Sequence, residues 1–369
     1  MVASNPNSIV TYLFAFDMKD LKYCAAYLLP ISAALALTLP GPWRWATVIL
    51  AFGILPIMEL WSPASAHNPV PDEEDQRSGL WFFDALLYLN LPVVYATLVA
   101  YLLVATGVVM PFVDLLGLTL SVGIVLGANG INVAHELGHR VHPAEQFWAK
   151  LLLLPTLYQH FFIEHNRGHH KYVATPQDPA TARRNEWLYT FWLRSVSQSW
   201  LGAWHLEHQR LTAAHLPVWS RHNEMLRFTA AQVVYLGSIT WLLGLPGLLA
   251  ALAVGVVSFL LLETINYIEH YGLLRRQLSS GRYEPVNPTH SWNSDHELGR
   301  IFLYELTRHS DHHYKATRKY QILRHLDESP QLPFGYPTCM LIAVLPPLWF
   351  RLMNPILDQQ DAHRPHAAA

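Results

Sequence analysis

The sequence predicts an all-α membrane protein, with six transmembrane helices and a cytoplasmic-side helical cap that holds a histidine-rich site for two metal ions. Three features of the 369 residues lead to this prediction. Hydrophobic residues make up 51% of the chain and charged residues only 14%, whereas soluble domains carry roughly 25% charged residues. Several apolar stretches are long enough to cross a bilayer as helices. Nine of the 21 histidines fall into four short clusters.

Six apolar stretches each approach the ~20 residues that a membrane-spanning helix needs. They cover residues 21–39, 43–60, 80–109, 112–133, 226–245 and 247–268. The links after the first, third and fifth stretches are very short and contain proline, which suits helical hairpins, whereas the other connections are long and polar. We therefore expect a single membrane-embedded domain over residues 1–369, with a polar tail at 358–369.

The distribution of positive charge predicts the orientation in the membrane. Of the 25 Lys and Arg residues, only Arg44 lies near a short link. Cytoplasmic loops carry the excess of Lys and Arg, so the long polar segments should face the cytoplasm. The alternation of short and long connections then places all four histidine clusters on that same side, where they can meet.

Further apolar segments are expected to lie in the membrane plane or at its surface. Residues 147–163 are short for a span and are interrupted by Pro155, and a crossing there would separate the first two histidine clusters. The Trp-rich segment 187–204 and the proline-broken segment 338–353 are also typical of interfacial helices. The acidic segment 69–79 is expected to be a solvated loop.

The four clusters are HELGH at 135–139, EHNRGHH at 164–170, NYIEHYG at 266–272 and RHSDHH at 308–313. Residues four apart share one face of an α-helix. His135 with His139, and His165 with His169, can therefore each point into one space. His170 lies about 100° further round the helix than His169, so it could serve a second metal ion.

Together the clusters predict a site for two metal ions. Imidazole binds Fe, Zn, Cu or Ni, and nine histidines are too many for one ion but supply four or five ligands to each of two. The predicted metal ligands are His135, His139, His165, His169, His170, His270, His309, His312 and His313.

Polar residues beside these histidines are expected to support catalysis. A carboxylate that accepts a hydrogen bond from the far N–H of a ligand histidine fixes the tautomer and orientation of the ring. The candidates for this role are Glu136, Glu164, Glu269 and Asp311. The alternative for each is a solvated or interhelical carboxylate. Asn266 precedes His270 by one helical turn and could orient a metal-bound water.

The fourth apolar stretch is rich in small residues. These are Gly117, Ser121, Gly123, Gly127, Ala128 and Gly130. Small residues let neighbouring helices pack closely. They could also leave a tunnel from the lipid to the metal site, and the sequence leaves both interpretations open.

The four motifs resemble those of the integral-membrane non-haem di-iron alkane 1-monooxygenases, the last of them over residues 306–313. Membrane fatty-acyl desaturases and hydroxylases share the histidine clusters. The NYIEHYG element is similar to that of the alkane monooxygenases and the related xylene monooxygenases. Arg140 and Thr307 depart from the family pattern, but at positions that are not ligands. The resemblance extends from the first span to about Leu326.

The resemblance implies a desaturase/hydroxylase-like fold with two iron ions in a bacterial inner membrane. It implies hydrocarbon degradation, in which O2 and a lipid-soluble medium-chain n-alkane give a primary alcohol. The implied electron donor is rubredoxin, reduced by its NAD(P)H-dependent reductase. Cys24 and Cys339 cannot build a rubredoxin centre, so the donor is either separate or a fused domain absent from this chain. The net charge of −2 favours no nucleic-acid partner.

Three other functions are compatible with parts of the pattern. HELGH also fits the HExxH motif of a membrane zinc protease, with Glu136 as general base, but this leaves seven histidines unexplained. A fatty-acyl desaturase or hydroxylase, or a xylene-type methyl monooxygenase, would use the same metal site. A metal transporter would need ligands within the spans rather than beyond their inner ends.

Lys and Arg residues near the motifs could form a docking surface for an acidic electron donor. They are Arg167, Lys171, Arg183, Arg184, Arg275, Arg276, Lys315, Arg318 and Lys319. Alternatively, these residues reflect the general excess of Lys and Arg on the cytoplasmic side of membrane proteins, where they contact phospholipid.

Overall fold

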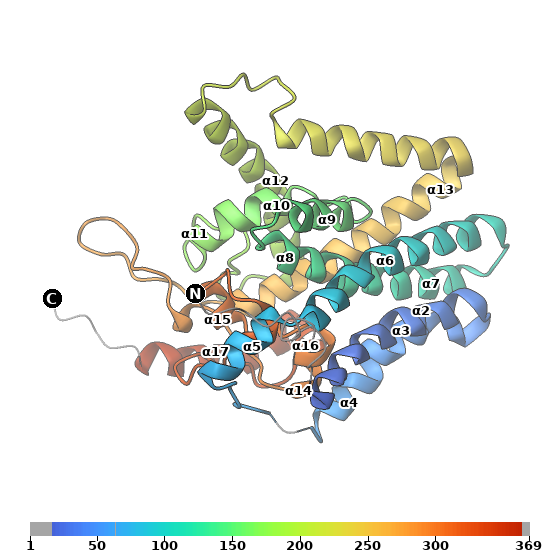
Figure 1. Cartoon of the computed structure of the whole chain (residues 1–369). Coiled ribbons are helices and arrows are strands. Elements are labelled where there is room, and N and C mark those ends of the chain that lie inside the picture. Colours follow the sequence, from blue (N-terminus) through green and yellow to red (C-terminus); the bar gives the residue numbers. More distant parts are fainter. Residues whose placement is uncertain (1–16, 63, 364–369) are drawn as a thin grey trace, which may run out of the picture.

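The computed structural model describes residues 17–62 and 64–363. Within these ranges the chain forms helices joined by loops, with isolated β-bridges as the only strand-like pairing. Figure 1 shows long helices that extend to one side of the molecule, while shorter helices and the longer loops gather at the opposite end. The all-α prediction is therefore confirmed for the described residues.

Five helices are long and apolar enough to cross a membrane. Their bounds are Met18–Thr38, Gly41–Glu59, Trp81–Gly107, Phe112–Gly138 and Glu224–His270. The first comprises η1 (Met18–Tyr27) and α2 (Leu28–Thr38), and the second η2 (Gly41–Trp45), α3 (Ala46–Ile49), η3 (Leu50–Ile54) and α4 (Leu55–Glu59). The third is α6, and the fourth comprises α7 (Phe112–Val125), η4 (Leu126–Ile131) and α8 (Asn132–Gly138). The fifth is α13.

The helix α13 contains both of the last two predicted spans. It leaves helical geometry at Gly244 (φ 67°, ψ −163°), two residues before Pro246. Glycine tolerates this positive φ, and proline cannot donate the next backbone hydrogen bond. The two arms of α13 diverge at this bend and run back toward the same side (Figure 1). The predicted count of six spans therefore stays a prediction.

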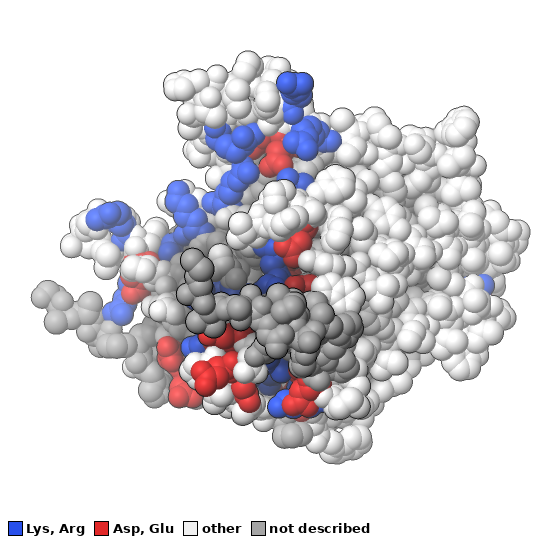
Figure 2. Space-filling view, viewed as in Figure 1, with Lys and Arg blue, Asp and Glu red and all other residues white. Residues whose placement is uncertain are grey.

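The remaining helices surround the end of the bundle where the long connections lie. They are α5 (Pro71–Gly79), α9 (Pro143–Leu153), α10 (Phe161–Glu164), η5 (His165–His169), α11 (His170–Tyr172), α12 (Leu188–Ala213), η6 (Pro288–His290), α14 (Glu297–Phe302), α15 (His309–Tyr314), η7 (Tyr320–Ile322), α16 (Tyr336–Ala343) and α17 (Pro346–His363). Figure 2 shows charged side chains concentrated at this end, whereas the visible surface of the bundle is almost free of them. This separation is expected of a protein embedded in lipid.

Two of the segments predicted to lie along the membrane are not among the helices that are both long and apolar enough to cross it. Residues 147–163 comprise the end of α9, a turn and the start of α10, and residues 187–204 fall almost entirely in α12. The prediction of a loop at 69–79 is wrong, because residues Pro71–Gly79 form helix α5. Proline at the first helical position and three acidic residues in the first turn favour this helix start.

Polar side chains tie the bundle to the segments that carry the histidines. The side-chain amide of Asn129 donates to the Oδ1 of Asn90 at 2.9 Å, and the amide of Asn90 lies 3.1 Å from the hydroxyl of Tyr304. All three residues are buried. Such hydrogen bonds help to hold membrane helices together, and here they link α6 and η4 to the loop before α15.

The small residues of α7 and of η4, which continues it, serve close helix packing. A methyl group at Gly123 would overlap the side chain of Val257 on α13, and one at Gly127 would lie 2.7 Å from Leu261. Gly117 similarly leaves space for the ring of Trp45. Gly127 and Ala128 also line an internal cavity, so both interpretations of these residues apply to this helix.

Gly123→Ala is expected to destabilise the protein by about 1–3 kcal/mol, because the added methyl group forces α7 and α13 apart. The measurement is the midpoint of thermal unfolding in detergent. Gly237→Ala provides the matched control, because Gly237 is also inside a helix but has open space at its Cβ position. An equal loss of stability in the two variants would contradict the proposed packing.

Candidate metal centre

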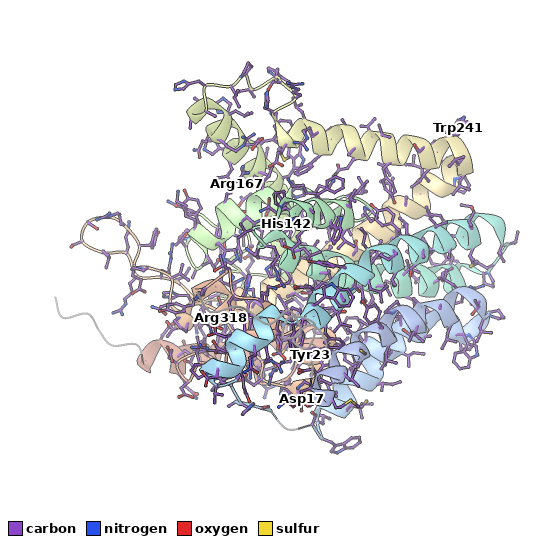
Figure 3. The ribbon with its side chains drawn as sticks, in the orientation of Figure 1. Asp17, Tyr23, His142, Arg167, Trp241 and Arg318 are labelled. Carbon is purple, nitrogen blue, oxygen red and sulfur yellow. The ribbon has the colours of Figure 1, made fainter. Side chains whose placement is uncertain are left out.

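The four histidine clusters meet at one end of the bundle. The first is carried by α8, which continues the membrane helix α7 through the π-helical turn η4. The second occupies η5 and the start of α11, the third ends α13, and the fourth forms α15. In Figure 3, Arg167 of η5 and Arg318, which follows α15 in the chain, lie at the charged end, and Trp241, near the bend of α13, lies at the other.

The nine predicted histidines form two compact groups. The first group is His135, His139, His165, His170 and His312, and the second is His169, His270, His309 and His313. Within each group the candidate ligand nitrogens all lie within 4.8 Å of one another. Each group therefore has the size and donor type of a single metal site, which agrees with the prediction of four or five imidazoles per ion.

The ring nitrogens that face one another are the Nε2 atoms. In the first group, the Nε2 of His135 lies 2.9 Å from that of His312, and the Nε2 of His165 lies 3.0 Å from those of His139 and His170. In the second group, the Nε2 of His309 lies 3.1 Å from that of His270 and 2.9 Å from that of His313. Convergence of one ring edge from several helices is the arrangement that a metal ion requires.

A π-helical turn changes the pairing that a regular helix predicts. Residues His165–His169 form η5, in which the backbone N–H of His170 donates to the carbonyl of His165, five residues earlier. The wider turn places His165 beside His170 in the first group and sends His169 to the second. The predicted pairing of His165 with His169 is therefore wrong. Single π-turns of this kind are frequent at functional sites.

The surroundings favour the neutral form of four imidazoles, whose pKa values they lower. Burial, followed by the nearby His169, lowers the pKa of His139 to about 3. Burial and the neighbouring histidines also hold the pKa values of His165, His170 and His312 well below the usual range for histidine. A neutral imidazole is the form that binds a metal ion, so these rings are ready to act as ligands.

The carboxylates predicted to orient the histidines have other neighbours. Glu136 accepts hydrogen bonds from Arg140 and from the backbone N–H of Tyr320. Asp311 accepts from Arg318 and from the backbone N–H of Arg324. Neither has a hydrogen bond with a far histidine nitrogen among the described residues.

Glu269, Glu164 and Asn266 are also buried near the two groups. One carboxylate oxygen of Glu269 accepts from the hydroxyl of Tyr336 at 2.8 Å, and the other lies 3.3 Å from the Nε2 of His309. Glu269 thus approaches the inward edge of that ring rather than its far edge. Asn266 lines the internal cavity described below, and Glu164 is buried beside Gly168.

Asp178 makes the contact that was expected of those carboxylates. Its Oδ2 lies 2.9 Å from the Nδ1 of His169 and accepts a hydrogen bond from the hydroxyl of Thr181 at 2.6 Å. Its Oδ1 accepts from the backbone N–H of Ala180. Asp178 is outside the four motifs, nine residues after His169, so the sequence pattern provided no signal for it.

An apolar cavity leads from the membrane helices to both histidine groups. Its walls include Leu55 and Ile124 from the bundle, and it reaches His135 and His165 of the first group and His309 of the second. A separate groove on the outside of the bundle shares four residues with this cavity: Phe52, Ile124, Leu261 and Met340. A wall of single side chains therefore separates the cavity from the groove.

Comparisons with known proteins match most of the chain. The model of the fatty acid desaturase family matches residues 111–342. The chain is 40% identical to Alkane 1-monooxygenase 2 of Pseudomonas aeruginosa over 86% of this chain and 84% of that protein. It is 38% identical to Alkane 1-monooxygenase of Ectopseudomonas oleovorans over 92% and 86% of the respective lengths. The xylene/toluene monooxygenase hydroxylase component XylM of Pseudomonas putida is 28% identical over 91% and 88%.

Proposed function

Because the chain belongs to the fatty acid desaturase family and to the alkane 1-monooxygenases, and is therefore an integral membrane monooxygenase with a non-haem metal centre, we propose that it hydroxylates the terminal methyl group of medium-chain n-alkanes. In this proposal the metals are two irons and rubredoxin supplies the electrons. The observation that carries it is the division of nine imidazoles, seven of them buried and two half-buried, into groups of five and four at the end of an apolar cavity.

The donor set fits two iron ions. Imidazole is a suitable ligand for iron, and the histidines would hold one ion in each group. The Nε2 atoms of His309 and His313 face other histidines of their group, whereas their Nδ1 atoms have no hydrogen-bond partner among the described residues, so the Nε2 edge is the side organised for binding. When bound, the irons supply the activation of O2 and the cleavage of the terminal C–H bond.

The protein itself selects, positions and encloses the substrate. The net reaction takes an alkane, O2, two electrons and two protons to a primary alcohol and water. Alkanes partition from water into lipid, and the shared wall of groove and cavity offers a direct route from the membrane. The narrow apolar lining, which includes Leu55, Ile124 and Gly127, favours an extended chain with one end beside the histidines. The same lining excludes water from the reacting carbon.

We place the metal centre on the cytoplasmic side of a bacterial inner membrane. The clustering of the charged residues at one end of the described chain supports this orientation (Figure 2). Protons, rubredoxin and its NAD(P)H-dependent reductase would then act from the cytoplasm, whether rubredoxin is a separate protein or a fused domain. The whole chain would form one hydroxylase domain.

The proposed docking surface for rubredoxin is smaller than the nine basic residues predicted from the sequence. Five of these residues form ion pairs with acidic residues of the chain: Arg167, Arg184, Arg276, Arg318 and Lys319. Lys171, Arg183 and Lys315 are exposed and belong to no ion pair among the described residues. These three cations are the better candidates for an acidic partner.

Exchanging Lys171 and Lys315 for glutamate is expected to slow the reduction of the enzyme by rubredoxin about ten-fold at low salt, because steering by opposite charges is lost. The difference should shrink as ionic strength rises. Stopped-flow measurement of rubredoxin oxidation tests this. The control is Arg221→Glu, on the connection between α12 and α13. Equal slowing by the control, or no dependence on salt, would contradict the docking surface.

The proposed function is tested by measuring iron in the purified protein together with the turnover of octane by added rubredoxin and reductase. Two irons per chain and 1-octanol as the product are expected. A single zinc without iron would instead favour a zinc protease, and turnover of an acyl thioester but not octane would favour a desaturase or fatty-acyl hydroxylase. Preference for xylene over octane would favour a xylene-type methyl monooxygenase.

A further inference from the structure

Glu59 introduces a carboxyl group into the apolar cavity. It is the last residue of α4, its side chain is only 3% exposed, and it lines the cavity that also reaches His309. The backbone at Gly299 and Gly335 lies against it, and a methyl group at Gly335 would overlap the carboxyl group. Glycine at these positions leaves the space that Glu59 occupies.

The carboxyl group of Glu59 lacks an adequate partner within the described part of the chain. Neither oxygen forms a well-aligned hydrogen bond, and neither belongs to an ion pair. The polar group that approaches it is the backbone N–H of Gly299. A buried carboxyl group gives up its hydrogen bonds to water, and this is costly unless another group replaces them. The position therefore calls for a hydrogen-bonding ligand.

The surroundings of Glu59 restrict the chemistry of that ligand. Leu55, Phe302, Pro337 and Met340 line the same cavity, so a strongly hydrated ion or a sugar would lose too many contacts with water. A molecule with a long apolar chain and one hydroxyl group matches both the lining and the carboxyl group. The primary alcohol formed in the proposed reaction is such a molecule.

We propose that Glu59 accepts a hydrogen bond from the hydroxyl group of a primary alkanol, so that the cavity binds the alcohol as well as the alkane. This inference rests on the proposed function for the identity of the alcohol. It explains why a cavity suited to hydrocarbons contains a carboxyl group that an alkane cannot satisfy. It also means that the alcohol competes with the alkane for the same space.

The direct test is the binding of 1-octanol and octane to the purified full-length protein in nanodiscs, measured by calorimetry without turnover. The wild-type protein should bind 1-octanol more tightly than octane. Glu59→Leu should weaken 1-octanol binding about ten-fold and leave octane binding unchanged or tighter. Glu59→Gln keeps an acceptor and should retain most of the affinity for the alcohol.

Met340→Leu is the matched control, because it changes another residue of the same lining without altering a polar group. It should change the affinities for both ligands by the same factor. The inference is overturned if Glu59→Leu binds 1-octanol normally, or if wild-type protein binds 1-octanol no better than octane; this second comparison needs no variant to fold. If 1-octanol binding does not depend on Glu59 but octane is still hydroxylated, this inference fails and the proposed function stands. If 1-octanol binding depends on Glu59 but octane is not hydroxylated, the proposed function fails and the binding role of Glu59 stands.

Discussion

Replacing His309 by alanine is expected to lower octane hydroxylation by more than 100-fold and to remove about half of the bound iron. His309 belongs to the group of four and lies within 3.1 Å of two of its partners. Its loss leaves three imidazoles in a buried site, and lost ligands weaken metal binding more than the 10–100-fold typical of lost supporting contacts. Elemental analysis and product chromatography measure the two effects.

The comparison with His312→Ala makes this prediction specific. His312 belongs to the group of five, so its removal leaves four imidazoles and should retain more metal than His309→Ala, although activity should still fall. His208→Ala, at an exposed histidine on α12, should leave iron content and activity unchanged. Full iron occupancy in His309→Ala would exclude the assignment of His309 as a ligand.

Asp178→Asn is expected to weaken metal binding in the group of four by about 10–100-fold. Asp178 accepts the hydrogen bond from the Nδ1 of His169, so its negative charge orients the ring and makes the opposite Nε2 a stronger ligand. Asparagine has nearly the same shape but no charge. Competition with a chelator measures the affinity, and octane turnover should fall in parallel.

Asp311→Asn provides the contrast for this prediction. Asp311 directly precedes His312, but its contacts are with Arg318 and Arg324 rather than with a histidine. The substitution should therefore change chelator resistance by less than about three-fold. If Asp311→Asn and Asp178→Asn lose metal equally, proximity to a histidine in the sequence predicts the supporting residues better than the hydrogen bonds do.

The nine histidines could be predicted from the sequence because their side chains act together and their motifs are local. Their division into two groups could not, because it depends on the π-turn over His165–His169, and a sequence pattern assumes regular helical spacing. Asp178 and Glu59 were also beyond prediction. Each is a single acidic residue outside the motifs, and each comes near the site only through the packing of segments distant in the sequence.

The membrane helices were predicted by their length and hydrophobicity, with ends that agree within a few residues for the first three spans. The fourth helix extends to Gly138, beyond the predicted end at residue 133, because the histidine-bearing segment continues it without a break. The acidic segment 69–79 was expected to be a loop because it is polar all round. Contacts such as the ion pair between Arg77 and Asp20 hold it instead as a helix.

The way in which the two histidine groups share the chain determines how far apart the proposed irons can lie. His169 and His170 are consecutive residues but belong to different groups, and the same is true of His312 and His313. Neighbouring Cα atoms are held about 3.8 Å apart by a trans peptide bond. Covalent geometry at these two places therefore restricts the distance between the proposed irons. This distance should change little when the bundle flexes or when the bilayer becomes thicker or thinner.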